Sequence, residues 1–123
     1  MNDNEKIKLL YSKGMRCYNS GDYFNAHEHW EELWSDYYLE DRKFIQGLIQ
    51  LAVSFVHLQN GNLKGAKSLL KKCEEKFLRF SDIQRGIDVS ELLEQISVVS
   101  ENYNSLKNLE DFDWDLVPNL DYK

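Results

Sequence analysis

His27 and Glu31 are the two side chains of this sequence whose types and spacing could support chemistry together. They stand four residues apart within the segment Tyr23–Tyr38, and at 100° per residue that spacing puts both on one helical face. An imidazole and a carboxylate one turn apart can share a hydrogen bond or bind one divalent metal ion. The rest of this face is aromatic and consists of Tyr23, Trp30, Trp34 and Tyr38. A polar pair inside an aromatic stripe is therefore the candidate functional site.

A strip of polar residues on another predicted helix could face this pair. Between Phe44 and Leu63 there is no Asp, Glu, Lys or Arg. A membrane span needs roughly 20 predominantly apolar residues. This window is too polar to cross a bilayer, so we expect a central helix that is buried on most sides. Its polar residues recur at i, i+4, i+8 and i+11, namely Gln46, Gln50, Ser54 and His57. The predicted buried cluster therefore consists of His27, Glu31, Trp34, Gln50 and His57.

Two interpretations of this cluster remain open. In the first, it is a structural lock in which His27 donates to Glu31, and Gln50 or His57 satisfies the remaining polar atoms. In the second, it is a metal site with His27, Glu31 and His57 as ligands. Two imidazoles and one carboxylate with open positions suit Zn²⁺, Mn²⁺ or non-haem Fe²⁺. Gln50 or Glu28 could then orient a ligand from outside the coordination shell.

A metal-dependent enzyme is a further alternative that would use the same residues. A water activated by the metal, with Glu31 or Glu28 as base, would give a hydrolase-like reaction. The sequence offers no nucleophile elbow, no phosphate-cradling glycine loop and no CxxC pair. The catalytic residues are therefore unknown, and the sequence favours a binding protein over an enzyme.

Composition and charge narrow the class of protein. A chain of 123 residues with 42% hydrophobic residues suits one domain with its own core. One proline and six glycines leave long uninterrupted segments, which favours helices. The net charge of −6 argues against general nucleic-acid binding, because phosphate backbones attract basic surfaces. Without a signal-peptide pattern, and with only Cys17 and Cys73 as thiols, we expect a cytoplasmic protein with no membrane partner.

Hydrophobic periodicity and capping residues predict an all-α fold with five helices. They are expected at residues 4–19, 22–39, 41–59, 63–80 and 88–106, with Asp22, Asp41, Asn62 and Asp88 as N-caps. Residues 81–87 should form a loop. The helical domain is expected to span residues 1–107, followed by an acidic extended tail at 108–123 that could dock on the lysine side of the fourth helix through Trp114.

A weak internal repeat predicts how these helices are arranged. The segment Gly21–Trp30 matches Gly61–Leu70 at an offset of 40 residues, and each copy has the order tight turn, N-cap and helix. We therefore expect a compact irregular bundle of two helical hairpins and a closing helix. The hairpins resemble tetratricopeptide repeats, although that family has a period of about 34 residues. The resemblance implies a further alternative, a peptide-binding scaffold with a groove lined by the first and third helices.

The spacing His27-x-x-x-Glu31-x-x-Trp34 resembles the HxxxExxW motif of a bacterial and archaeal helical family known as "domain of unknown function 309". The block from Phe44 to Leu70, and Gly86-Ile87-Asp88 further on, extend the resemblance over most of residues 5–100. It implies an all-α fold and suggests that the motif binds metal, but it carries no established activity. We therefore expect a small helical binding or interaction module that has a protein partner or forms a homo-oligomer.

Overall fold

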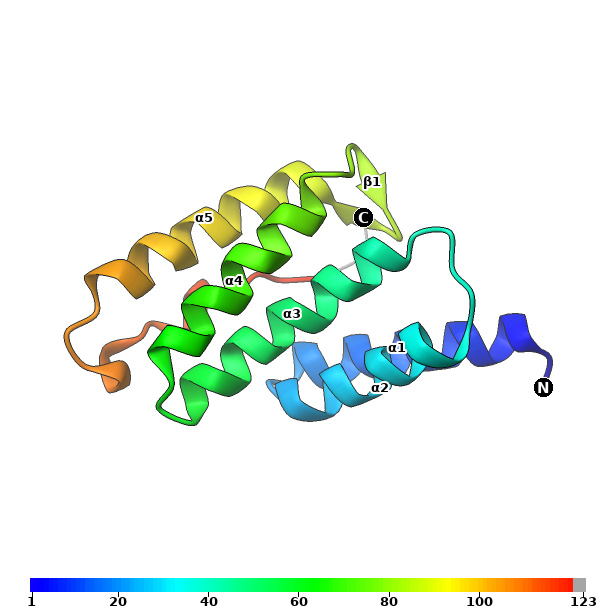
Figure 1. The fold of residues 1–123 in the computed structure, drawn as a ribbon, viewed down its shortest axis with the longest axis horizontal. Coiled ribbons are helices and arrows are strands. Elements are labelled where there is room, and N and C mark those ends of the chain that lie inside the picture. Colours follow the sequence, from blue (N-terminus) through cyan, green and yellow to red (C-terminus); the bar gives the residue numbers. More distant parts are fainter. Residues whose placement is uncertain (121–123) are drawn as a thin grey trace.

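The computed structural model describes residues 1–120 and confirms the predicted all-α fold (Figure 1). The helices are α1 (Asp3–Asn19), α2 (Tyr23–Asp36), α3 (Arg42–Gln59), α4 (Leu63–Phe77) and α5 (Val89–Ser105). Two short strands, β1 (Ile83–Gln84) and β2 (Ile87–Asp88), pair in antiparallel fashion between α4 and α5. Two 3₁₀ turns follow α5, η1 (Leu109–Asp111) and η2 (Trp114–Leu116).

The first four helices form two hairpins, α1–α2 and α3–α4, with the same turn chemistry. Gly21 and Gly61 take positive φ angles of 84° and 78°, which an L side chain rarely adopts. The next residue, Asp22 or Asn62, caps the following helix, because its side-chain oxygen accepts from the backbone N–H three residues later. The repeat at an offset of 40 residues is thus visible as two equivalent turns.

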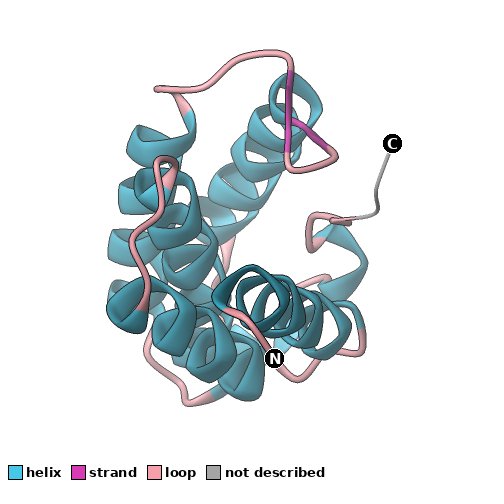
Figure 2. Cartoon of the chain, turned by 90° about the vertical axis from the view of Figure 1, so that its right-hand side faces the viewer, coloured by secondary structure: helices cyan, strands magenta, loops and turns pink. Residues whose placement is uncertain are grey.

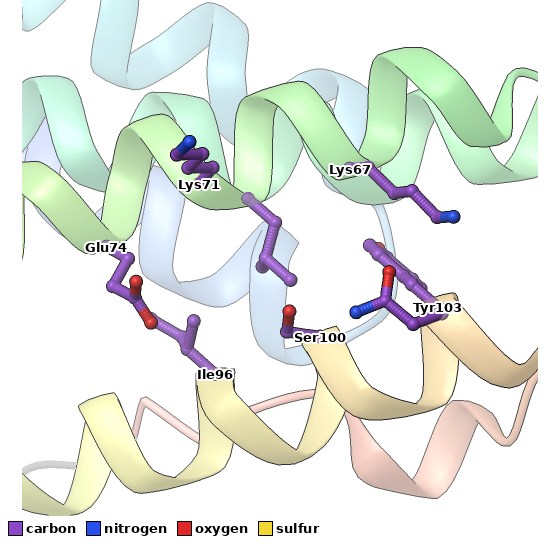
Figure 3. Close-up of a pocket in the computed structure, with 8 residues that line it drawn as sticks. Lys67, Lys71, Glu74, Ile96, Ser100 and Tyr103 are labelled. Carbon is purple, nitrogen blue, oxygen red and sulfur yellow. The ribbon is translucent and has the colours of Figure 1, made fainter.

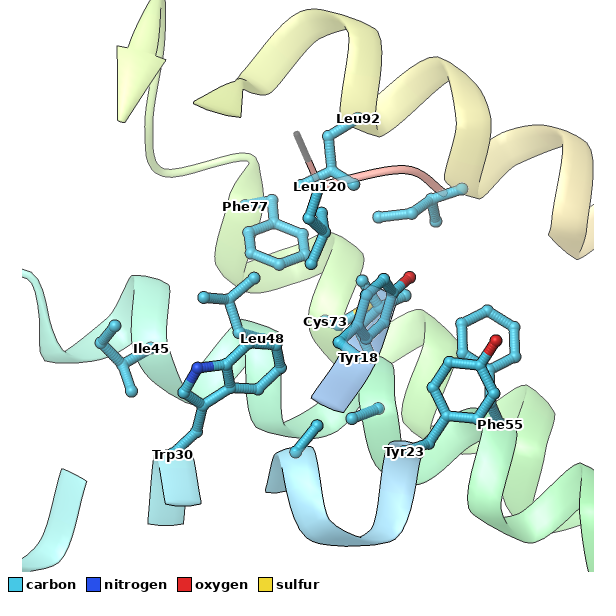
Figure 4. Packing of buried hydrophobic residues seen from close by; sticks show 14 of the residues in the cluster. Tyr18, Tyr23, Trp30, Ile45, Leu48, Phe55, Cys73, Phe77, Leu92 and Leu120 are labelled. Carbon is cyan, nitrogen blue, oxygen red and sulfur yellow. The ribbon is translucent and has the colours of Figure 1, made fainter. Parts of the chain in front are cut away.

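Helix α3 lies in the middle of the bundle, with α2 on one side and α4 on the other (Figures 1 and 2). Each helix packs on the next one along the chain. The core between them is rich in aromatic rings, and Figure 4 shows Trp30, Phe55 and Phe77 reaching into it from three different helices. A helix with neighbours on both sides has little surface left for charged groups, which explains the absence of charge on the covered sides of α3.

Two glycines allow helices to approach closely. A Cβ at Gly14 would lie 2.1 Å from Nε1 of Trp30, whose indole N–H donates to the carbonyl of Tyr11 at 3.2 Å. A Cβ at Gly47 would lie 2.7 Å from the ring of Phe77. The first contact fixes α2 on α1 and the second fixes α4 on α3.

The buried hydroxyl of Ser54 joins three helices. It donates to the carbonyl of Ala66 in α4 at 2.7 Å, and the hydroxyl of Tyr103 in α5 lies 3.0 Å away. Because the proton of Ser54 goes to Ala66, the tyrosine acts as donor to the serine oxygen. Burial raises the pKa of Tyr103 well above its usual value, so this phenol stays protonated and available as a donor.

Asp41 has a different role from the one expected. It precedes α3 as predicted, but its side chain makes no capping hydrogen bond. Its carboxylate instead binds Arg85 and Gln84 of the β1–β2 hairpin, with Nη2 of Arg85 2.9 Å from Oδ1 of Asp41. The segment 81–87, expected to be a plain loop, therefore contains a strand and most of a hairpin that fastens the α2–α3 connection.

Two predicted helix ends need correction. Helix α2 stops at Asp36 rather than Leu39, and α4 stops at Phe77 rather than Phe80. As a result, Tyr38 does not belong to the aromatic stripe: it lies beyond the helix and is 83% exposed. No helix within residues 1–120 is long and apolar enough to span a membrane.

The C-terminal segment is folded against the core as far as the structure describes it. Phe112 and Leu120 are buried, and the hydroxyl of Tyr18 donates to the carbonyl of Pro118 at 2.8 Å. Trp114 stacks on Tyr23 in α2, with ring centroids 6.1 Å apart, and does not lie on the lysine side of α4. The expected extended tail thus contains two 3₁₀ turns, and its residues 121–123 lie outside the described part of the chain.

We predict that Gly14→Ala destabilises the protein by about 2–3 kcal/mol, because the new methyl group would overlap the Trp30 indole. Urea unfolding followed by circular dichroism measures this loss. Ser12→Ala, on the exposed side of the same helix, is the control and should change stability by less than about 0.5 kcal/mol. Equal stabilities of the two variants would contradict the close approach of α1 and α2.

The Asp41–Arg85 pair predicts a pH-dependent stability. Burial acts to raise the pKa of Asp41, but the hydrogen bonds and charge of Arg85, aided by Gln84, outweigh it and hold that pKa below its usual value. The pair therefore stabilises the fold above the ordinary carboxyl pKa of about 4, and the contribution disappears as pH falls through the lowered value.

Asp41→Asn should accordingly cost about 1–2 kcal/mol at pH 7, between the values for surface and buried pairs. Its deficit relative to the wild type should shrink as pH is lowered below about 4. Urea unfolding at several pH values measures this, with the exposed Glu101→Gln as control. A deficit that is independent of pH would mean that Asp41 contributes through packing alone.

Candidate functional site

An open cleft of about 350 Å³ lies between α2 and α3. We call it the α2–α3 cleft. Its walls come from three residues of α2 and four residues of α3, namely His27, Glu31, Trp34, Gln46, Ile49, Gln50 and Val53. The structure thus brings together four of the five residues of the predicted cluster.

The ring of His27 is oriented by its own helix. Its Nδ1 atom contacts the backbone carbonyl of Phe24, one turn earlier. A carbonyl can only accept, so Nδ1 carries the proton and Nε2 of the neutral ring is an acceptor. Nε2 lies 3.6 Å from a carboxylate oxygen of Glu31 and 3.9 Å from one of Glu28. The arrangement leaves the Nε2 lone pair available to a ligand, a proton or a metal ion.

The cleft is open to solvent, which corrects the expectation of a buried cluster. The side chain of His27 is 16% exposed, whereas that of Glu31 is 61% exposed and stands at the rim. Because α2 lies beside α3, only the part of the α2 polar face that is nearest to α3 is covered. A sealed lock between the two helices does not match this exposure, because water reaches the pair.

Trp34 forms the end wall of the cleft near the start of α3. The guanidinium group of Arg42 lies over its ring, 4.3 Å from the centroid, in a cation–π contact. The indole Nε1 atom is buried, and within residues 1–120 it has no hydrogen-bond partner. The same holds for the amide oxygens Oε1 of Gln46 and Gln50 on the opposite wall. Native proteins pair almost all such atoms. The cleft holds three of the five unpaired side-chain atoms buried in the described chain, and the other two belong to Gln95 and Asn102 of α5.

His57 does not join the cluster. It lies at the end of α3, where its Nδ1 is 3.4 Å from the amide nitrogen of Asn62, and it is not among the residues that line the cleft. Gln50 and His57 do share a face of the helix, but seven residues separate them by about 10 Å along its axis. In the described chain, no three His, Cys, Asp or Glu side chains gather closely enough to hold a metal ion. The predicted ligand set of His27, Glu31 and His57 is therefore not assembled.

Three members of the cleft were not among the predicted site residues: Gln46, Ile49 and Val53. Gln46 was visible as part of the polar strip, one turn before Gln50. Ile49 and Val53 carry no polar signal, and only their position on the outward face of α3 could have identified them. Arg42 was also missed, because its contact with Trp34 crosses the loop between two helices.

A second pocket of about 320 Å³ lies between α4 and α5 (Figure 3). Its residues on α4 include Lys67, Lys71 and Glu74, which correspond to His27, Glu31 and Trp34 at the offset of 40 residues. In Figure 3 the side chain of Lys71 points away from α5. The hairpin architecture therefore produces a similar hollow twice, but of these two pockets only the first is lined by a histidine and an indole.

Comparison with known proteins supports the family resemblance. Residues 11–69 match the family described as "Domain of unknown function (DUF309)", which confirms the prediction made from the motif. The matched segment includes every residue of the α2–α3 cleft, but it is shorter than the expected range of 5–100.

An uncharacterised protein of Aquifex aeolicus (strain VF5) is 29% identical to this chain over 84 residues. The alignment covers 68% of this chain and 25% of the relative, so the chain spans about a quarter of the length of the curated relative that it matches. Neither the family description nor the name of the relative states an activity.

Proposed function

We propose that this chain is a small helical binding module and that the α2–α3 cleft is its binding site. The observation that carries the proposal is the set of unpaired buried atoms at the cleft: the indole N–H of Trp34 and the amide oxygens of Gln46 and Gln50. A buried polar atom without a partner costs about 1–3 kcal/mol. A ligand that supplies the missing partners would recover much of this cost.

The chemistry of the walls indicates a ligand with amide groups. Trp34 offers a donor, and the two glutamine amides need donors from the ligand. Because all three atoms are buried in the free protein, small side-chain rotations must expose them as the ligand enters. A peptide-type amide has one N–H and one C=O and can satisfy both kinds of wall. Ile49 and Val53 add apolar contact between the polar groups. A polypeptide segment of a partner protein fits this combination.

The second pocket supports the same proposal. Because Lys67, Lys71 and Glu74 occupy the equivalent positions on α4, packing of such a hairpin does not require a histidine, a carboxylate and an indole there. The three residues of α2 are therefore better explained by a role at the cleft than by the needs of the fold. The cleft lies between α2 and α3, whereas the tetratricopeptide-like alternative would need a groove between α1 and α3.

We predict that N-methylacetamide, a minimal peptide group, moves the indole N–H resonance of Trp34 in a ¹⁵N–¹H NMR titration. The other two tryptophans are internal controls, because Trp30 is buried and bonded to Tyr11, and Trp114 is 41% exposed on another part of the surface. Gln50→Leu should reduce the shift at least twofold, since one amide partner is lost. A shift at Trp114 as large as that at Trp34 would count against a specific site.

A divalent-metal site is the second candidate, and one observation favours it: Nε2 of His27 is free to coordinate and Glu31 is next to it. Zinc normally takes at least three protein ligands, and the third predicted ligand, His57, lies elsewhere. The residues of this chain alone thus fit a two-ligand site, which solvent or a partner would have to complete. A metal-dependent hydrolase would need the same completion.

Elemental analysis of protein purified without a His-tag distinguishes the metal candidate from the amide-binding one. If the metal candidate holds, one Zn, Mn or Fe per chain should be lost in His27→Ala and retained in His57→Ala, and chelator should lower the melting temperature. Absence of stoichiometric metal together with a responsive Trp34 would leave the amide-binding module alone.

A further inference from the structure

The outward face of α3 is uncharged although much of it is accessible. Six half-buried residues form this face, and none is Asp, Glu, Lys or Arg: Gln46, Ile49, Gln50, Val53, Val56 and His57. Charged residues make up 29% of the chain, and helices at a protein surface usually carry them on the outward side. A neutral, partly apolar strip in the middle of an accessible face is typical of a surface that another protein covers.

The two edges of this face carry opposite charges. On the α2 side stand Glu28 and Glu31, whose side chains are more than half exposed. On the α4 side, Gly65 lies against His57, and Lys72 and Lys76 share the helical stripe of Gly65 about two and three turns later. Figure 1 shows α2, α3 and α4 side by side with α3 in the middle. The face is therefore acidic at the α2 edge, neutral in the middle and basic at the α4 edge.

We propose that a second copy of this chain covers this face and forms a two-fold symmetric homodimer. The inference rests on the proposed function, because it names the partner that binds at the α2–α3 cleft. A two-fold interface brings the same patch of both subunits together, so the patch must complement itself. An acidic edge, a neutral centre and a basic edge satisfy this condition in one orientation.

The charges select the direction of the symmetry axis. With the axis parallel to α3, the acidic edge of each copy meets the basic edge of the other, and α3 packs on its partner's α3. With the axis across the helices, α2 would meet α2 and acid would face acid, which is unfavourable. Rotation about an axis parallel to α3 also leaves the position of each residue along that axis unchanged.

The positions of the charged groups along the helices agree with a two-fold axis parallel to α3. On α4, Ala66 lies beside Ser54 and Phe77 beside Gly47, so Lys72 lies roughly level with the middle of α3. On α2, Glu31 lines the cleft together with Gln50, which is also in the middle of α3. Three helices about 10 Å apart and about 20 Å long present roughly 600 Å². This approaches the area of about 800 Å² that each partner buries in a standard interface.

Sedimentation equilibrium of the untagged chain tests the proposal. The wild type should have twice the chain mass of 14.6 kDa at micromolar concentration. The double variants Glu28→Lys/Glu31→Lys and Lys72→Glu/Lys76→Glu should each be monomers, because like charges then meet at both contacts. Mixed in equal amounts, they should form a heterodimer, since every acidic edge again meets a basic one. Lys67→Glu/Lys71→Glu, at two residues that line the pocket between α4 and α5, makes the same change of charge and should stay dimeric.

A monomeric wild type, a dimer that survives both edge variants, or a mixture that stays monomeric would each overturn the homodimer. Circular dichroism establishes that the variants are folded before they are compared. Because the dimer would compete with N-methylacetamide for the cleft, the shift of Trp34 should be larger in the monomeric Lys72→Glu/Lys76→Glu variant, which keeps every residue of the cleft. This titration tests the proposed function separately. A monomeric wild type with a responsive Trp34 would remove the homodimer and leave a different protein as the partner.

Discussion

The burial of α3 on three sides is the constraint on which the rest of the structure depends. A helix of eighteen residues with one basic pair at its start and no charge in its body is stable in water only when other elements cover it. Helix α2 covers one flank, and α4 covers the other through the contacts at Gly47 and Ser54. Tyr103 and Phe112 close the inner side, where their rings lie 5.4 Å apart. Only the outward strip stays accessible, so the fold itself determines where a partner can reach α3.

The same constraint explains why the candidate site is a cleft rather than a sealed lock. Trp30 fills the space between α1 and α2, and its indole N–H donates to the carbonyl of Tyr11 within that hairpin. Trp34, four residues later, lies near the start of α3, where Arg42 covers its ring but nothing within residues 1–120 accepts from its N–H. Trp30 thus holds the α1–α2 hairpin together, whereas Trp34 forms a wall of the cleft.

Local signals in the sequence were enough for the helices, their caps and the two hairpins, because these depend on neighbours within a few residues. The side chains of Asp22, Asn62 and Asp88 each accept from the N–H three residues on, as predicted. Contacts between distant segments were not predictable in this way. Asp41 looks like a cap, but its partner Arg85 is 44 residues away. His57 shares a helical face with Gln50, and angular position alone does not reveal the 10 Å or so between them along the axis. Ser54 belongs to the same polar strip, but its hydrogen bond to the carbonyl of Ala66 depends on where α4 packs against α3.

The internal repeat separates what the fold needs from what the site needs. Positions that hold helices together are equivalent in both hairpins: Ala26 and Ala66 are fully buried, and Trp30 and Leu70 are both buried large side chains. Positions that line the two hollows carry different residues, because His27, Glu31 and Trp34 correspond to Lys67, Lys71 and Glu74. If packing alone determined these residues, the two hollows would be lined alike. The difference between them agrees with the proposal that the first hollow is the binding site, on the side of the bundle where the outward strip of α3 is neutral.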